Sequence, residues 1–161
     1  MPDRERETVV MDGLQCLADT WGDIVDPAME RFYKQYPDAL ESFEYHGLGE
    51  RHNLEGMMIE QVIYFLMTWP EDPSEISIIM DNSVRHHHDV LQVFPRWYIG
   101  LIDAVIGLIF EALPDNSDNA RRVWREIRDE LAKEIELSRE GFYRKDNAGP
   151  LPVFGMGKDA G

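Results

Sequence analysis

Apolar residues recur every three or four positions along most of this chain. Near the N-terminus, Val10, Leu14 and Leu17 follow this spacing. The same spacing recurs over residues 54–65. It gathers side chains on one face of an α-helix. No segment alternates apolar and polar residues with a period of two, so the pattern predicts consecutive helices and no β-sheet.

Glycine and proline predict where the first three helices begin and end. Gly22 follows the first apolar strip and predicts the end of the first helix. Asp26 followed by Pro27 predicts a cap and a proline in the first turn of the second helix. Pro37 ends that helix and begins a short third helix that runs to Phe43.

Residues 44–49 contain two glycines and are expected to be the least regular part of the chain. A longer helix then ends near Trp69. Asp72 predicts the next helix start, with Glu75 placed three residues later to complete a capping box. That helix carries four residues at intervals of four, which share one strip of its surface: Ile76, Met80, Val84 and His88.

Pro95 predicts the start of another helix, and residues 116–118 supply cap candidates for the last one, which runs to Tyr143. Beyond Arg144 the chain becomes rich in glycine and proline. We therefore expect one folded domain over residues 1–145 and a mobile C-terminal tail over residues 146–161.

Composition narrows the classes of partner. The chain has 161 residues, 43% of them apolar, which predicts one folded domain. Its formal net charge of −15 argues against nucleic acid and anionic lipid as partners. The most apolar stretch, residues 98–113, is interrupted by Asp103 and Glu111 and is too short for a membrane span. A single cysteine, Cys16, forms no internal disulfide and fits a reducing cytoplasm.

Three consecutive histidines, His86, His87 and His88, are the most prominent chemical feature. Neighbouring helical positions point about 100° apart, so adjacent histidines cannot bind one metal ion together. Only His88 continues the apolar strip of its helix. A lone histidine on such a strip is most often a hydrogen-bonded core residue, so its role depends on the surrounding sequence.

The residues after His88 resemble those of the globin family. Val93, Pro95 and Tyr98 follow His88 at the offsets of a globin, and the run over residues 95–100 looks most like that of bacterial globin-coupled sensors. The same residues also suit flavohaemoglobins and their single-domain relatives.

The resemblance covers roughly residues 14–143. Residues 31–43 are similar to the globin segment that ends in the phenylalanine stacked on haem. The last helix, from Trp124 to Tyr143, also matches the bacterial globin pattern.

The resemblance implies an all-α, globin-like fold of about seven or eight helices around a pocket for haem b. His88 would be the proximal ligand of the iron, and Phe43 would pack on the porphyrin. Tyr98 would lie on the proximal side, able to form a hydrogen bond near His88. Val84 and Val93 would contribute apolar contacts to the cofactor.

On the opposite, distal side the chain departs from its relatives. Bacterial globins of this type usually hold bound oxygen with a tyrosine in the second helix, and the matching residue here is Met29, which donates no hydrogen bond. Distal candidates on the next long helix are His52, Asn53 and Met57. His52 could also coordinate the iron itself, and His46 is a weaker candidate for that role.

Three functions follow from the resemblance. The first is a haem globin that binds a diatomic gas, oxygen or nitric oxide, for sensing or as a single-domain gas binder. The second is a haem enzyme, a nitric oxide dioxygenase or a peroxidase-like protein, which needs a separate reductase. The third is a cofactor-free globin fold that serves as an interaction or signalling module. A separate reductase or a signalling partner is a candidate partner of the chain. The amphipathic first and last helices leave room for a homodimer in each case.

Overall fold

Seven helices make up the part of the chain that the structure describes. The computed structural model describes residues 3–89 and 95–146, with side chains given for all of these except 83–89, 95 and 138–146. Within these residues there is no β-strand, which confirms the all-α prediction. The helices are α1 (Arg4–Trp21), α2 (Val25–Gln35), α3 (Pro37–Gly47), α4 (Arg51–Thr68), α5 (Pro73–Asp89), α6 (Pro95–Ala112) and α7 (Asp118–Asp146).

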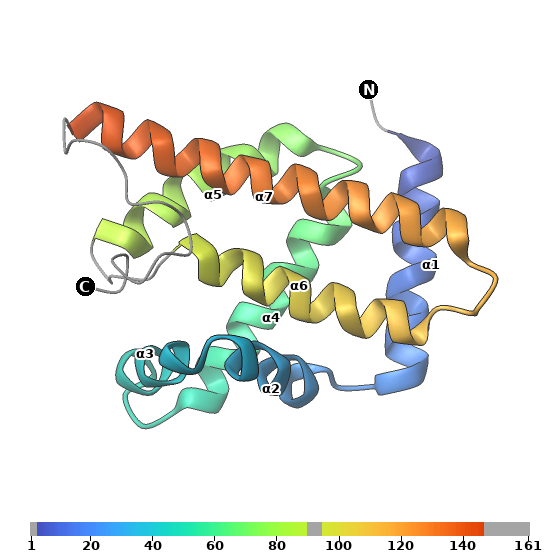
Figure 1. The fold of residues 1–161 in the computed structure, drawn as a ribbon, viewed down its shortest axis with the longest axis horizontal. Coiled ribbons are helices and arrows are strands. Elements are labelled where there is room, and N and C mark those ends of the chain that lie inside the picture. The colour runs from blue at the N-terminus through green and yellow to red at the C-terminus, as the bar shows by residue number, and fades with distance from the viewer. Residues whose placement is uncertain (1–2, 90–94, 147–161) are drawn as a thin grey trace.

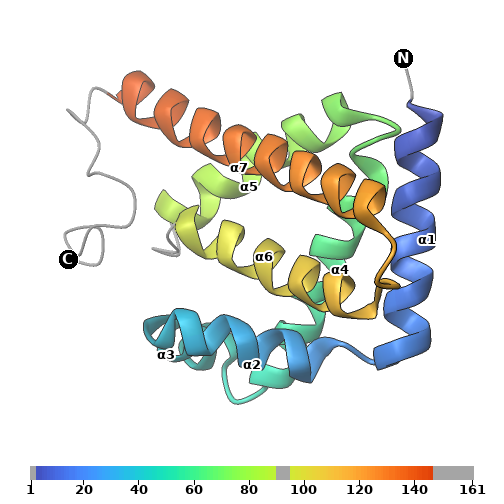
Figure 2. The same cartoon turned by 45° about the vertical axis from the view of Figure 1, so that its right-hand side comes forward.

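Helix α6 lies at the centre of the molecule (Figure 1). It contacts α1, α2, α4 and α7, and α7 in turn packs against α5. The turned view shows α1 standing at one end of the paired helices α6 and α7 (Figure 2). A helix that is apolar around most of its circumference has to be buried on several sides, and α6 is such a helix. Its buried apolar residues include Ile102, Val105, Leu108 and Ile109.

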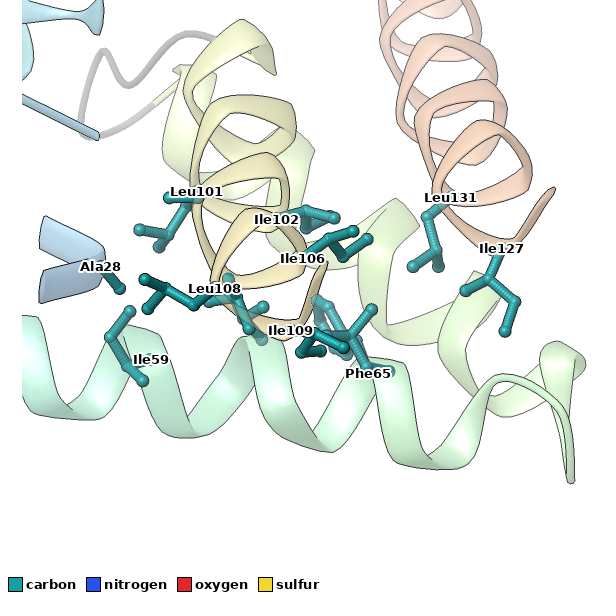
Figure 3. Packing of buried hydrophobic residues seen from close by; sticks show 14 of the residues in the cluster. Ala28, Ile59, Phe65, Leu101, Ile102, Ile106, Leu108, Ile109, Ile127 and Leu131 are labelled. Carbon is teal, nitrogen blue, oxygen red and sulfur yellow. The ribbon is translucent and has the colours of Figure 1, made fainter. Parts of the chain in front are cut away.

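The core forms where α4, α6 and α7 meet. Ile59 of α4 lies near Leu108 of α6, and Phe65 of α4 lies near Ile109 (Figure 3). Ile127 and Leu131 of α7 reach the same cluster from the other side, and both are fully buried. This packing orients α4 and α7 relative to α6.

Several predicted helix ends are confirmed. Gly22 caps α1 with a positive φ of 65°, and its N–H donates to the carbonyl oxygen of Ala18. A glycine adopts this conformation without steric cost. Pro37 lies in the first turn of α3, and Pro95 begins α6.

The predicted cap of α2 was wrong. Val25 is the first helical residue, so Asp26 lies inside the first turn. The reason is that the carboxylate of Asp23 accepts a hydrogen bond from the N–H of Val25 at 3.0 Å, which allows an earlier start.

The irregular segment is shorter than predicted. Residues 44–47 continue α3, and the chain departs from helical geometry at Leu48, with φ 50°, and Gly49, with φ 88°. Two successive residues with positive φ reverse the chain direction, so three residues, 48–50, are enough to separate α3 from α4.

The predicted capping box of α5 forms only in part. The N–H of Glu75 donates to Asp72 Oδ1 at 3.2 Å. The Glu75 carboxylate does not return the bond, because the N–H of Asp72 already donates to the carbonyl oxygen of Thr68. Glu75 accepts instead from the hydroxyl of Tyr64 at 2.6 Å.

None of the helices in the described part of the chain combines the length and the apolar composition that a bilayer crossing requires. The predicted tail begins at the last residue of α7, and its remainder, residues 147–161, lies outside the described residues.

Gly100 permits the close contact between α6 and α2. A Cβ atom at this position would lie 2.3 Å from Cε2 of Tyr36 and 3.3 Å from Cε1 of Phe32. Both rings belong to the segment that leads into α3, so a side chain at position 100 would displace them.

We therefore predict that Gly100→Ala lowers the free energy of unfolding by about 1–3 kcal/mol, as overpacking does. The matched control is Gly56→Ala in α4, where an added Cβ meets no atom within 4 Å. The control is expected to raise stability by about 0.5–1 kcal/mol, because alanine favours helix over glycine. Urea denaturation of both variants measures the difference, and equal stability of the two would contradict the packing account.

Candidate functional site

Phe43 belongs to an aromatic cluster formed by α2 and α3. Its half-buried ring meets Phe32 at a centroid distance of 5.9 Å and Tyr33 at 5.7 Å, both edge to face. Phe32 also contacts Tyr36 at 5.8 Å. Edge-to-face contacts are favourable and directional, so they define the orientation of the Phe43 ring.

A buried carboxylate lies beside this cluster. Among the residues whose side chains are described, Glu55 is the only buried acidic residue, with 5% of its surface exposed. It accepts a hydrogen bond from the Tyr33 hydroxyl at 2.7 Å. The guanidinium of Arg51 lies 3.3 Å from the same carboxylate oxygen, and Nδ1 of His52 lies 3.5 Å from the other.

These contacts link three helices. Arg51 of α4 also donates to Glu44 of α3 at 2.8 Å. His52 lies 3.7 Å from Asp26 of α2. The polar groups around Glu55 therefore tie α2, α3 and α4 together at one corner of the molecule.

The same surroundings raise the pKa of the Tyr33 phenol well above its usual value. Burial is the largest cause, since it disfavours the charged phenolate. The hydrogen bond to Glu55 adds to it, because ionisation of Tyr33 would bring two negative charges together.

Sequence reasoning missed the role of Glu55. The available signal was its spacing, because Glu55 lies four residues before Ile59 and seven before Val62, both buried on the same face of α4. A carboxylate on a buried strip requires partners, which indicates a polar contact inside the fold. Which partners it finds depends on packing with α2.

Met29 lies on α2 with only 2% of its surface exposed, so the residue predicted in place of a distal tyrosine does face the interior. The side chains of three other residues predicted on the distal side are exposed on the surface instead. Met57 is 61% exposed, the side chain of His52 is 69% exposed, and the exposed Asn53 donates to the Glu50 carboxylate at 3.1 Å.

The rotation of α4 explains this placement. Ile59 is fixed in the core, and a residue two positions away points about 200° from it around the helix axis, so Met57 faces the solvent. Leu54 and Met58, each one residue after a predicted pocket residue, are half-buried instead. The inward face of α4 thus follows the apolar strip predicted over residues 54–65, and the pocket residues that the resemblance implied lie one position away from it.

His46 makes local contacts in α3. Its Nδ1 lies 2.9 Å from the carbonyl oxygen of Ser42 and 3.2 Å from the Ser42 hydroxyl. These contacts engage the ring within its own helix, so recruiting Nδ1 as an iron ligand would break them.

The structure describes only some of the residues predicted on the proximal side of the haem. The backbone of α5 extends through His88, but the side chains of Val84 and His88, and all of Val93, lie outside the described residues. Earlier on the same strip, Ile76 and Met80 are fully buried. Tyr98 of α6 is half-buried and packs against the core.

Comparison with known proteins found no match to a family model, to a curated protein or to a solved structure.

The raised pKa of Tyr33 predicts a pH dependence of stability. The unfolded phenol ionises near pH 10, whereas the folded one ionises at higher pH. The contribution of the neutral phenol is therefore complete below about pH 10 and is lost as the pH rises through the folded pKa. Above pH 10, the urea concentration at the midpoint of denaturation should fall more steeply with rising pH in the wild type than in Tyr33→Phe. Parallel curves would show that Tyr33 is not perturbed.

Proposed function

We propose that this chain is a haem-binding globin that binds a diatomic gas, oxygen or nitric oxide, at an iron held by His88. The observation that carries the proposal is the burial of Ile76 and Met80. These two residues precede His88 on one strip of α5, so the described part of that strip faces the interior.

Several apolar side chains on the described helices are available to line a haem pocket. Helix α5 contacts both α4 and α7. Met29 and Met80 are buried apolar side chains, and Leu54 and Met58 are half-buried ones. The neutral imidazole of His88 is a ligand that haem iron accepts, as in globins. Apolar side chains and a neutral imidazole are what a haem requires of a protein, and this chemistry supports the proposal.

Each residue has a distinct part in this proposal. The haem supplies the iron on which the gas binds. His88 would hold that iron through one ring nitrogen, and its second ring N–H would be satisfied by Tyr98 or by a backbone carbonyl, which would orient the imidazole. Phe43 would pack on the porphyrin, and its ring contacts those of Phe32 and Tyr33.

The distal side sets the gas chemistry. Met29 offers no hydrogen bond to a polar ligand, and His52 and Asn53 are exposed and engaged with carboxylates. A negatively polarised oxygen ligand is stabilised mainly by a nearby donor. A site poor in donors favours reversible binding of a less polar gas over nitric oxide dioxygenation.

His88→Ala tests the iron ligand. Purified wild-type protein mixed with haem is expected to develop an intense Soret band, and the variant is expected to lose it or to show a grossly altered spectrum, because the protein nitrogen on the iron is removed. His86→Ala is the matched control and is expected to keep the wild-type spectrum. An unchanged spectrum in His88→Ala would refute the proposal.

A second test uses the register of α4. Met58→Gln places a hydrogen-bond donor on the half-buried side of the helix, whereas Met57→Gln places it in solvent. We expect Met58→Gln to slow oxygen dissociation about tenfold, the effect of one hydrogen bond to a charged group, and Met57→Gln to leave it unchanged. Stopped-flow measurement of oxygen release compares them, and a larger effect at position 57 would contradict the proposed register.

A further inference from the structure

We infer that Glu55 is a positioning residue that orients Phe43 through Tyr33. The contact between Phe43 and the porphyrin rests on the proposed function. The linkage among the three side chains does not depend on it, because all of them are described without the cofactor.

The first step is the bond between α2 and α4. The Tyr33 hydroxyl donates to Glu55 Oε2 at 2.7 Å, a short hydrogen bond to an ionisable acceptor. Glu55 is buried on α4, a helix anchored in the core by Ile59 and Phe65. The acceptor is therefore fixed, and the bond holds the Tyr33 side chain in place at its hydroxyl end.

The second step is the contact between rings. Tyr33 meets Phe43 at 5.7 Å with an interplanar angle of 82°. Phe43 lies in α3, an 11-residue helix separated from α2 by a single residue, Tyr36. A short helix with so brief a connection depends on side-chain contacts for its position, and the Tyr33 ring supplies one of them.

A second connection between Glu55 and α3 consists of ion pairs made by Arg51. Arg51 lies 3.3 Å from Glu55 and donates to Glu44, the residue after Phe43, at 2.8 Å. Glu55 is thus connected to α3 in two ways. One path runs through the Tyr33 ring to Phe43, and the other runs through Arg51 to Glu44.

If Glu55 only filled space in the core, an apolar side chain of similar size would suit the position better than a carboxylate. Burying an ionised group costs free energy that ion pairing recovers incompletely, and apolar side chains of similar size often stabilise such positions. What Glu55 adds at this position is a directed acceptor for the Tyr33 hydroxyl. This favours a role in orientation over a role in stability.

The chain contains a matched control for the same chemistry. The Tyr64 hydroxyl donates to Glu75 at 2.6 Å between exposed side chains, and the aromatic cluster on α2 and α3 does not include Tyr64. Tyr64→Phe removes an equivalent tyrosine–glutamate bond without touching Phe43.

The first experiment uses the cofactor-free protein. Nuclear magnetic resonance with labelled phenylalanine follows the Phe43 ring in the wild type, Tyr33→Phe, Glu55→Gln and Tyr64→Phe. The inference predicts altered Phe43 ring shifts and weaker contacts to residue 33 in Tyr33→Phe, a smaller change in Glu55→Gln, which keeps an acceptor, and none in Tyr64→Phe. Unchanged Phe43 signals in Tyr33→Phe would overturn the linkage.

The second experiment uses the haem-loaded protein. Haem loss to an excess of an apoprotein acceptor is expected to be about tenfold faster in Tyr33→Phe than in the wild type, the effect of losing one hydrogen bond to an ionisable group. Glu55→Gln should fall between them, and Tyr64→Phe should match the wild type.

The two experiments separate the two claims. A Tyr33→Phe protein that loses stability but releases haem at the wild-type rate would overturn the positioning role, since a structural role alone gives that result. A wild type that takes up no haem would refute the proposed function, and the resonance experiment would still decide whether Glu55 orients Phe43.

Discussion

Burial of α6 among four other helices is the constraint on which the rest of the structure depends. Its apolar surface extends around most of the helix, so α1, α2, α4 and α7 all pack against it. Gly100 brings the rings of Phe32 and Tyr36 close to its backbone. The position of α2, and through it the aromatic cluster with Phe43, follows from this contact.

The same packing determines which side of α4 faces inward. Ile59 and Phe65 lie against α6, so the helix cannot rotate without losing core contacts. This rotation brings Glu55 inside, where it meets Tyr33, and turns Met57 toward solvent. Core packing therefore decides both the polar network at the α2–α3–α4 corner and the side chains that the proposed pocket receives from α4.

Much of the fold could be predicted because its signals are local. Gly22, Pro37 and Pro95 end or begin helices through backbone geometry that acts within one turn. The start of α2 was missed because its N-cap is Ile24, a residue type that gives no capping signal, while Asp23 binds the Val25 N–H from one position earlier.

The candidate site was harder to predict because its contacts are not local. The apolar strip over residues 54–65 already favours Met58 as the inward residue, and Met57 was assigned to the pocket only through the resemblance. Tyr33 and Glu55 are 22 residues apart, so their bond has no signature in the sequence around either residue. The strip that leads to His88 was predictable, since it follows one helix, and its described part is buried as expected.

The central claim is a bond between the imidazole of His88 and a haem iron. Resonance Raman spectroscopy of the ferrous, haem-loaded protein tests it most directly, with natural and with nitrogen-15-labelled histidine. The account predicts an iron–histidine stretching mode that shifts on labelling and is lost in a protein lacking the His88 imidazole. A haem complex without such a mode, or with one that persists when that imidazole is removed, would contradict it.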